Sequence, residues 1–310
     1  MPVCQIASGV ACLRIGVANV YFVGKAGKAW VLVDTGMPGG ARKIRAAAEL
    51  VYGLDARPAA ILLTHGHADH AGSAAELADH WNVPIYAHAL EMPYLTGRSQ
   101  YPPPDPTVGG FLAMIGRFAP RKTFNLGDRV RELGPSLEGL GLDGWDWHHT
   151  PGHSPGHVSF FRSEDGTLLA GDALTTVNLD SFFAAIVNHR HIWRPPTPFT
   201  PDWVQARESI RLLAALQPTT IGSGHGLPVS GDKAVLELAE LATNFPMPVT
   251  GRYVQEPARM DDRGVVSLPP KPPDALPGIA LGLGVAAAAG TLFALAARRR
   301  SASIKSAITG

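Results

Sequence analysis

Apolar residues recur along this chain with two periods, and the two periods alternate over most of its length. Short apolar runs typical of strands occur at 11–15, 20–23, 29–33, 59–64 and 83–87. Apolar positions spaced three and four residues apart predict helices at 41–52 and 71–81. Because strands and helices alternate, the pattern favours an α/β fold built in layers.

The second half of the chain continues this pattern, with two irregular segments inserted into it. Strands are predicted at 145–150, 158–161, 167–170 and 219–221, and helices at 202–216 and 234–244. The irregular segments 89–125 and 177–200 are rich in proline and aromatic residues. Long loops inside a compact domain usually serve binding, so we expect both segments to form walls of a site.

A different pattern occupies the C-terminus. Residues 278–297 contain no charge, and twenty helical residues would span about 30 Å, the thickness of a bilayer core. We therefore expect a transmembrane helix there, after a proline-rich linker at 256–277 and before a short basic tail at 298–310. Residues 1–255 would form the globular domain. Since the N-terminus lacks the pattern of a secretory signal, we expect a single-pass membrane protein whose large domain is cytoplasmic.

Charge and cysteine content narrow the classes of partner. The formal net charge of the 310 residues is +1, which gives no electrostatic footprint for a nucleic acid. We therefore expect no nucleic-acid partner. The two cysteines, Cys4 and Cys12, lie in no metal-binding spacing and flank a turn at Ser8-Gly9. We expect two thiols in a reducing compartment, although the turn would also permit a disulfide.

Four side chains of the kinds that bind metals fall within one short turn. The turn follows the apolar strand that ends near Leu63 and precedes the helix predicted at 71–81, so it lies where ligand sites of α/β folds open. Its metal-binding side chains are His65, His67, Asp69 and His70. Imidazole and carboxylate groups suit zinc and other divalent metals of similar softness. The turn therefore predicts a metal site.

Three further residues of the same kinds follow downstream, each next to glycine. His153 lies in a turn of glycines and prolines, Asp172 follows an apolar strand, and His225 lies between Gly224 and Gly226. Glycine allows the sharp backbone turns that would aim such side chains at one point. The order of these residues resembles the metallo-β-lactamase superfamily, as does the segment 31–36, in which Asp34 would be structural. The resemblance covers about residues 10–240.

The resemblance implies a fold and a dinuclear centre. The fold would be α/β, a four-layer αββα metallo-β-lactamase sandwich, with the transmembrane helix as an addition. By resemblance, the first metal would be held by His65, His67 and His153 and the second by Asp69, His70 and His225, with Asp172 between them. Two Zn²⁺ ions per chain are expected, with iron or manganese as alternatives. Two close cations can share a hydroxide that attacks the substrate, with Asp69 and Asp172 as the catalytic carboxylates.

The expected activity is that of a metal-dependent hydrolase, and the substrate is a small molecule. The turn at 149–157 is similar to that of lactonases, and the branch that includes glyoxalase II cleaves esters, thioesters or lactones. The transmembrane segment favours a lipophilic substrate. Three alternatives stay open at this point: a phosphodiesterase, a mononuclear iron oxidoreductase like the persulfide dioxygenases, and a metal-free binding scaffold. Metal analysis distinguishes the hydrolase from the iron enzyme. The sequence makes no prediction of the oligomeric state.

Overall fold

The computed structural model describes residues 3–116, 125–187 and 189–273. Residues 1–270 form one compact unit and residues 271–310 a second, and all elements named below belong to the first unit. The first sheet consists of β1 (Cys4–Ala7), β2 (Val10–Ile15), β3 (Ala18–Gly24), β4 (Trp30–Val33), β5 (Ala60–Leu62), β6 (Ile85–Ala87) and β7 (Val130–Glu132). The second sheet has the order β12 (Val229–Ser230), β11 (Thr220–Gly222), β10 (Thr167–Leu169), β9 (Val158–Arg162) and β8 (Trp145–His149).

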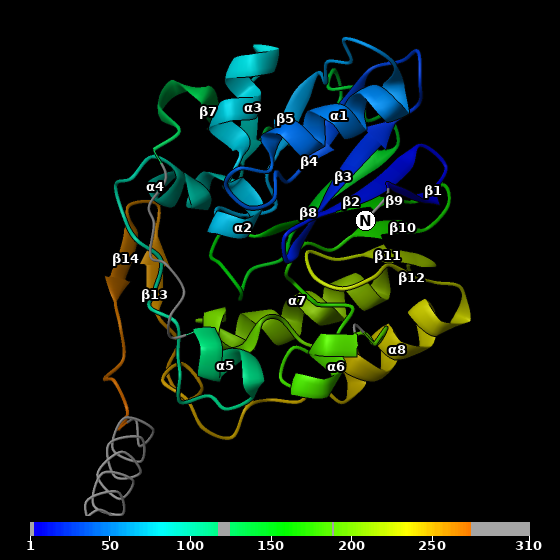
Figure 1. Ribbon diagram of the computed structural model, residues 1–310. Helices are drawn as coiled ribbons and strands as arrows, with labels where there is room; N and C mark the ends of the chain where they lie inside the picture. Colours follow the sequence, from blue (N-terminus) through cyan, green and yellow to red (C-terminus); the bar gives the residue numbers. More distant parts are fainter. Residues whose placement is uncertain (1–2, 117–124, 188, 274–310) are drawn as a thin grey trace, which may run out of the picture. The chain divides into compact units, whose positions relative to one another are not determined.

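Helices connect and cover the two sheets (Figure 1). The longer helices are α1 (Ala41–Tyr52), α3 (Ala74–Trp81), α7 (Trp203–Ala215) and α8 (Asp232–Thr243). The shorter ones are α2 (Ala68–Ala71), α4 (Met92–Leu95), α5 (Phe111–Gly116) and α6 (Phe182–Val187), with 3-10 turns η1 (Ala89–Glu91), η2 (Gly127–Arg129) and η3 (Thr197–Phe199). The predicted helix at 41–52 matches α1 residue for residue.

The first sheet changes direction at β4. Its first four strands pair antiparallel, and β4 to β7 pair parallel, with α1 connecting β4 to β5 and with α2 and α3 between β5 and β6. In the second sheet β10 and β11 are the one parallel pair among the described strands, and α7 connects them. Parallel neighbours end at the same edge of a sheet, so β5 and the pair β10 and β11 direct the residues that follow them toward sites at sheet edges.

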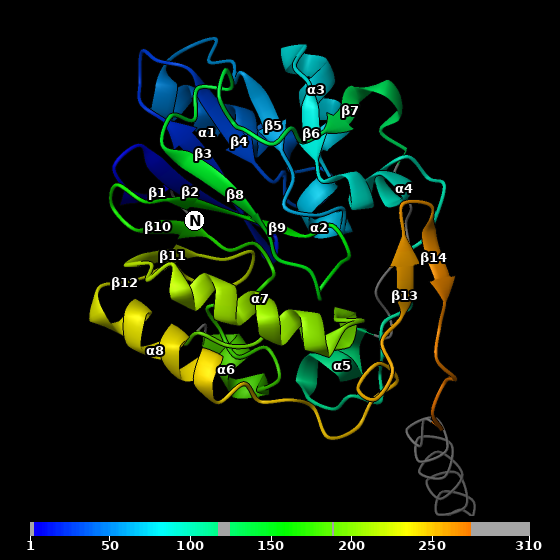
Figure 2. The ribbon, with the colours of Figure 1, turned by 180° about the vertical axis from the view of Figure 1, so that it is seen from behind.

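Alternate residues of each strand enter different cores, which defines four layers (Figures 1 and 2). On β4, Leu32 packs beneath α1 and α3, whereas Val31 and Val33 pack between the two sheets. On the second sheet, Phe160 enters the core between the sheets and Leu168 the core beneath α7 and α8. This is the two-residue alternation of strands buried on both faces. The predicted αββα sandwich is confirmed.

The two irregular segments contain short helices and are fixed to the rest of the unit. Asp105, which is 3% exposed, accepts hydrogen bonds from the Thr107 amide at 2.9 Å and from the Arg252 amide. The Tyr253 hydroxyl donates to the Pro103 carbonyl at 2.8 Å. The proline-rich loop therefore rests on a stretch of chain that follows α8.

Part of the segment predicted as a linker is folded. Residues 259–267 form a hairpin of β13 (Arg259–Asp261) and β14 (Gly264–Ser267). The Val265 amide donates to the Ser99 hydroxyl at 3.2 Å, and the Ala258 amide donates to the Pro201 carbonyl at 3.0 Å. The two strands are too short to give a clear apolar pattern, and the residues that bond this segment to the rest of the unit, Ser99 and Pro201, lie far away in the sequence. The strands are ordered through contacts that a local pattern does not contain.

The prediction of a transmembrane helix is corrected. The longest helix of the described residues, α7, has 13 residues and extends about 20 Å, which is too short for a bilayer core of about 30 Å. Across 3–116, 125–187 and 189–273, none of the helices combines the length and the apolar character that a membrane span requires. The segment 278–297 and the tail 298–310 lie outside the described residues. The described fold is the sandwich with the β13–β14 hairpin, and the predicted membrane anchor and membrane localisation are withdrawn.

Candidate metal centre

The turn after β5 places the first group of predicted ligands. The strand ends at Leu62, and the chain then turns through Thr64 into the short helix α2. The side chains of His65 and His70 are fully buried, whereas Asp69 is 28% exposed. The turn therefore directs several metal-binding groups toward the interior and leaves one carboxylate accessible to solvent.

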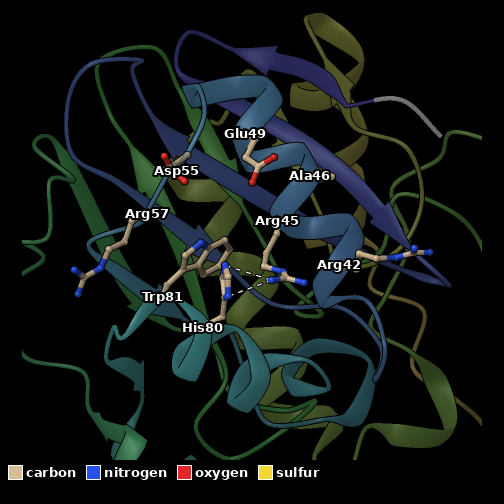
Figure 3. Close-up of a pocket in the computed structure, with 9 residues that line it drawn as sticks. Arg42, Arg45, Ala46, Glu49, Asp55, Arg57, His80 and Trp81 are labelled. Atoms are coloured by element: carbon tan, nitrogen blue, oxygen red, sulfur yellow. Dashed lines mark hydrogen bonds between the residues drawn. The ribbon is translucent and has the colours of Figure 1, made fainter.

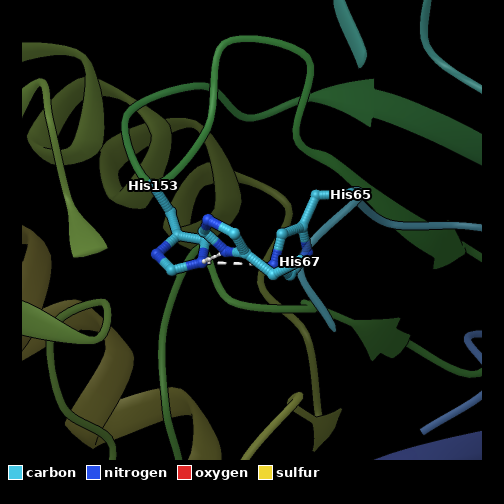
Figure 4. Close-up of side chains that lie close together, drawn as sticks. All are labelled: His65, His67 and His153. Atoms are coloured by element: carbon cyan, nitrogen blue, oxygen red, sulfur yellow. Dashed lines mark hydrogen bonds between the residues drawn. The ribbon is translucent and has the colours of Figure 1, made fainter. Parts of the chain in front are cut away.

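The imidazoles of His65, His67 and His153 converge on one point (Figure 4). The Nε2 atom of His153 lies 3.2 Å from Nε2 of His65 and 2.9 Å from Nδ1 of His67. Tetrahedral zinc with Zn–N bonds of about 2.0–2.1 Å separates its nitrogen ligands by roughly 3.3 Å. The three nitrogens therefore have a spacing close to that of zinc ligands, although they come from loops of two different sheets.

A second group of three residues lies beside the first. Asp69, His70 and His225 bring their ligand atoms together, and so do His65, His70 and Asp172. The Asp172 carboxylate lies 3.5 Å from Nε2 of His153 and 3.1 Å from Nε2 of His225. Asp172 thus stands between the two groups, as the bridging position requires. The structure brings all seven predicted ligand residues into one cluster.

Three buried polar atoms at this cluster make no hydrogen bond among the described residues. Nε2 of His70, Nδ1 of His153 and Oδ1 of Asp172 are inaccessible to solvent and make no hydrogen bond. Buried polar groups nearly always have partners, and unpaired ones point to an ion or water. Nε2 of His70 and Oδ1 of Asp172 lie 3.5 Å apart, so both atoms are directed into the cluster. The residues present therefore fit two divalent metal ions.

The pKa values of the histidines are shifted in opposite directions in the two groups. Burial, with the neighbouring imidazoles, holds the pKa of His65 and of His153 well below the usual range, and burial lowers the pKa of His67 to about 4. Burial alone would lower the pKa of His70, but the carboxylates of Asp172 and Asp34 raise it well above the usual range. The first group is therefore neutral near pH 7, as metal binding requires.

Asp34 fixes the orientation of His70. Its Oδ2 atom lies 2.8 Å from Nδ1 of His70, while the Thr64 amide and hydroxyl each donate to its carboxylate at 2.8 Å. Asp34 is 2% exposed and belongs to none of the ligand groups. A carboxylate that accepts from one ring nitrogen leaves the lone pair of the other nitrogen directed at the metal.

His157 holds the backbone at Asp172, and Asn19 holds the loop that contains His225. The Asp172 amide donates to Nε2 of His157 at 2.8 Å, and Nδ1 of His157 contacts the Thr150 hydroxyl at 2.8 Å. The Asn19 side chain donates to the carbonyls of Ser223 and Gly226 at 2.9 and 2.8 Å. Burial lowers the pKa of His157 to about 3, so its ring is neutral and able to accept.

The sequence pattern missed Glu91 and Tyr101. The Glu91 carboxylate is fully buried and joins the turn that contains Gly66 to the turn that contains Ser154. The Tyr101 ring lies with its centroid 4.3 Å from that of His67. A single carboxylate in the apolar stretch 85–95 was the one signal in the sequence that could have indicated Glu91.

A surface hollow elsewhere takes no part in this cluster. It has a volume of about 490 Å³ and lies over α1 and α3, where Arg45 contacts His80 at 3.1 Å. Figure 3 shows Arg42 and Arg57 directed away from each other, so the cations do not converge on one ligand. None of the predicted metal ligands lines it.

Comparisons with known proteins agree with the fold and the motifs. The family model described as the metallo-beta-lactamase superfamily matches residues 13–225. The probable metallo-hydrolase YflN of Bacillus subtilis is 40% identical over 244 residues, which cover 78% of this chain and 92% of that protein. The hydroxyacylglutathione hydrolase GloC of Haemophilus influenzae is 32% identical over 123 residues, or 39% of this chain and 52% of that protein.

The solved structures include a relative that binds metal. The di-iron-bound form of TTHA1623 is 26% identical, with a TM-score of 0.50, and the match covers 74% of this chain and 95% of that chain. The ordered motifs, the αββα layers and these matches agree with one another, and the chain belongs to the metallo-β-lactamase superfamily.

Proposed function

We propose that this protein is a metal-dependent hydrolase of a small molecule with an ester, thioester or lactone bond. The observation that supports it most strongly is the pair of ligand groups on either side of Asp172. Asp172 is 2% exposed and lies within 3.5 Å of His153 from the first group and of His225 from the second. A single structural ion would need one closed set of four ligands, whereas six residues around a shared carboxylate suit two ions with open positions.

The chain's own residues would bind the ions and direct the nucleophile. When bound, the two ions would lower the pKa of water and polarise the oxygen of the substrate. His65, His67 and His153 would hold the first ion, and Asp69, His70 and His225 the second. Asp69 contacts solvent at the cluster, so its carboxylate is placed to orient the attacking water and accept its proton. Asp172 would keep the two ions at a fixed separation.

Aromatic side chains beside the first ligand group support an organic substrate. The ring centroids of Tyr101 and Phe199 lie 4.3 and 6.0 Å from that of His67. They come from the two irregular segments that the sequence predicted as walls of the site. GloC is named a hydroxyacylglutathione hydrolase, which is a thioesterase, and this favours acyl substrates over phosphodiesters. Zinc is the metal that we propose.

Metal analysis and a substrate screen together test this proposal. The full-length protein would be purified without added metal, and zinc, iron and manganese per chain would be measured. The same sample would be assayed on ester, thioester, lactone and phosphodiester substrates. We expect about two zinc ions per chain and hydrolysis that Asp172→Ala abolishes. Asp165→Ala, in the β9–β10 turn, is the control and should retain activity.

Two results would refute the proposal. One tightly bound iron ion per chain without hydrolysis would favour oxidative sulfur chemistry. Hydrolysis that persists unchanged in metal-free protein would show that the bond is cleaved without the cluster.

A further inference from the structure

We propose that Glu91 is a positioning residue that fixes the three-histidine half of the metal centre by joining the two turns that supply it. The inference rests on the proposed metal centre, but it does not depend on the substrate or on the reaction. Glu91 ends the 3-10 turn η1 after β6, and its side chain is fully buried. It is not a ligand, because no group of converging metal-binding atoms includes it.

The Glu91 carboxylate accepts four hydrogen bonds from three segments. Oε2 accepts from the Gly66 amide at 2.9 Å and from the Tyr101 hydroxyl. Oε1 accepts from the Ser154 hydroxyl at 2.7 Å and from the Gly156 amide at 2.8 Å. A buried charge of this kind is costly unless its hydrogen-bonding capacity is filled, and these four donors fill it.

The donors lie next to the ligands in the sequence. Gly66 separates His65 from His67, and Ser154 follows His153. The first turn follows a strand of the first sheet, and the second turn connects β8 to β9 of the second sheet. Glu91 therefore sets the distance between ligands that come from opposite halves of the sandwich.

Glycine is required where the two turns approach this carboxylate. A Cβ atom on Gly156 would lie 2.8 Å from Cγ of Glu91, and a Cβ atom on Gly66 would lie 2.6 Å from the Tyr101 hydroxyl. Both distances are well below ordinary contact, so a side chain at either position would push the turn away from Glu91. The backbone is thus arranged for direct contact with the carboxylate.

An amide cannot replace this carboxylate, although it has the same shape. Each oxygen of Glu91 receives one hydroxyl and one backbone N–H. A hydroxyl can rotate and accept from an NH₂ group, but a backbone N–H can only donate. In Glu91→Gln, an NH₂ group in place of Oε1 would face the Gly156 amide, and an NH₂ group in place of Oε2 would face the Gly66 amide, whose other acceptor is the Tyr101 hydroxyl at 2.9 Å. Either orientation therefore removes the hydrogen bond between this side chain and the backbone of one of the two turns.

The effect should be confined to one half of the centre. The group of Asp69, His70 and His225 includes no residue from the turn at 153–157. Its supports are different, since Asp34 holds His70 and the Val17 carbonyl lies 3.0 Å from Nδ1 of His225. Residues that orient metal ligands through hydrogen bonds typically contribute 10–100-fold to metal affinity. We expect a loss of about that size for the three-histidine group alone.

The test measures zinc affinity of each half separately, with a chelating dye at equilibrium. In full-length protein, His225→Ala leaves the three-histidine group as the intact half, and His153→Ala leaves the other half intact. Glu91→Gln should weaken zinc binding at least about tenfold in the His225→Ala background. In the His153→Ala background, the same substitution should change the affinity less than about threefold. Neither measurement uses activity.

Ser154→Ala and Tyr101→Phe extend the test if Glu91→Gln does not fold. Each removes one donor to the carboxylate and leaves both glycine amides in place, so each should weaken the three-histidine half by a smaller factor. Glu237→Gln is the matched control. Its carboxylate accepts from the Ile192 amide at 2.9 Å and belongs to none of the ligand groups among the described residues, so the substitution should leave both halves unchanged.

Three results would overturn the inference. Equal affinity losses in the two backgrounds would show a general loss of stability. Unchanged affinity of the three-histidine half in Glu91→Gln would show that the two turns hold their places without the carboxylate. Wild-type protein that binds no zinc at all would refute the proposed metal centre itself, and the wild-type titration reports that separately.

Discussion

Replacing Asp34 by asparagine should weaken metal binding at His70, because the substitution changes which ring nitrogen of His70 carries the proton. The Asp34 carboxylate accepts from the Thr64 amide and hydroxyl and lies 2.8 Å from Nδ1 of His70. In Asp34→Asn, the oxygen must stay with the Thr64 amide, so the new NH₂ group faces Nδ1 of His70. That nitrogen then has to accept, and the imidazole proton moves to Nε2. The atom that would bind metal now carries hydrogen.

The expected loss of metal affinity follows from the fact that only one ligand, His70, is affected. Loss of a residue that orients a metal-bound histidine typically weakens metal binding 10–100-fold. This corresponds to about 1.4–2.8 kcal/mol for the ion held by Asp69, His70 and His225. The backbone should tolerate the change, because Asp34 has φ of 59° and asparagine accepts this left-handed conformation readily. The free energy of unfolding of the metal-free protein should therefore change less than metal affinity does.

Zinc titration of the His153→Ala background measures this ion alone. Asp165→Asn is the control, because Asp165 pairs with Arg162 at 2.7 Å in a hairpin turn outside the ligand groups. Binding by Asp34→Asn as tight as that of the parent would refute the reasoning. It would mean that His70 takes the required tautomer without the carboxylate.

Three further predictions concern the surroundings of the centre. Asn19→Ala should lower the free energy of unfolding by about 1–3 kcal/mol in urea titrations, because a buried carbonyl of the His225 loop loses its donor. Cys4 is exposed and should react with a thiol reagent at pH 8, whereas burial raises the pKa of Cys12 to about 12, so its thiol should react only after unfolding. Gly224→Ala should abolish binding of both ions in equilibrium dialysis, because its Cβ atom would overlap the carboxylate of Asp172.

Each of these predictions has a control or a contrary result. Wild-type stability of Asn19→Ala would show that water replaces the lost donor. Equal reaction rates of the two thiols in the native protein would contradict the burial of Cys12. Gly134→Ala is the control for Gly224→Ala, since the contact nearest to its Cβ atom is at 3.9 Å. Retained binding of two ions by Gly224→Ala would require a rearranged Asp172.

The parts of the metal centre that lie within a short stretch of sequence could be predicted from the sequence. The turn from His65 to His70 combines an apolar strand, ligand-type residues and a following helix, and all of these lie within a short window. Glu91 was not predictable in this way, because its partners Gly66 and Ser154 are 25 and 63 residues away. A hydrogen bond to a distant backbone amide leaves no periodic signal. The same reason explains why the folded hairpin at 259–267 was taken for linker.

The membrane prediction was made for the segment 278–297, which lies outside the described residues. It relied on composition, which records how apolar a stretch is and contains no information on packing. The layers were predictable because strands and helices alternate with distinct periods. The contact between the proline-rich loop and the chain after α8 was not predictable, because the Tyr253 hydroxyl donates to the Pro103 carbonyl, which lies 150 residues earlier in the sequence.

The division of the cluster between two sheets has a consequence for the order of synthesis. A ribosome adds about 5–20 residues per second, and 155 residues separate His70 from His225. The turn after β5 is therefore synthesised roughly 8–31 s before the last residue of the cluster. During that interval the nascent chain displays histidines to any metal in its surroundings, without the residues that complete either group. We expect the nascent chain to release such ions easily, so that the identity of the bound metal is decided only after the second sheet has folded.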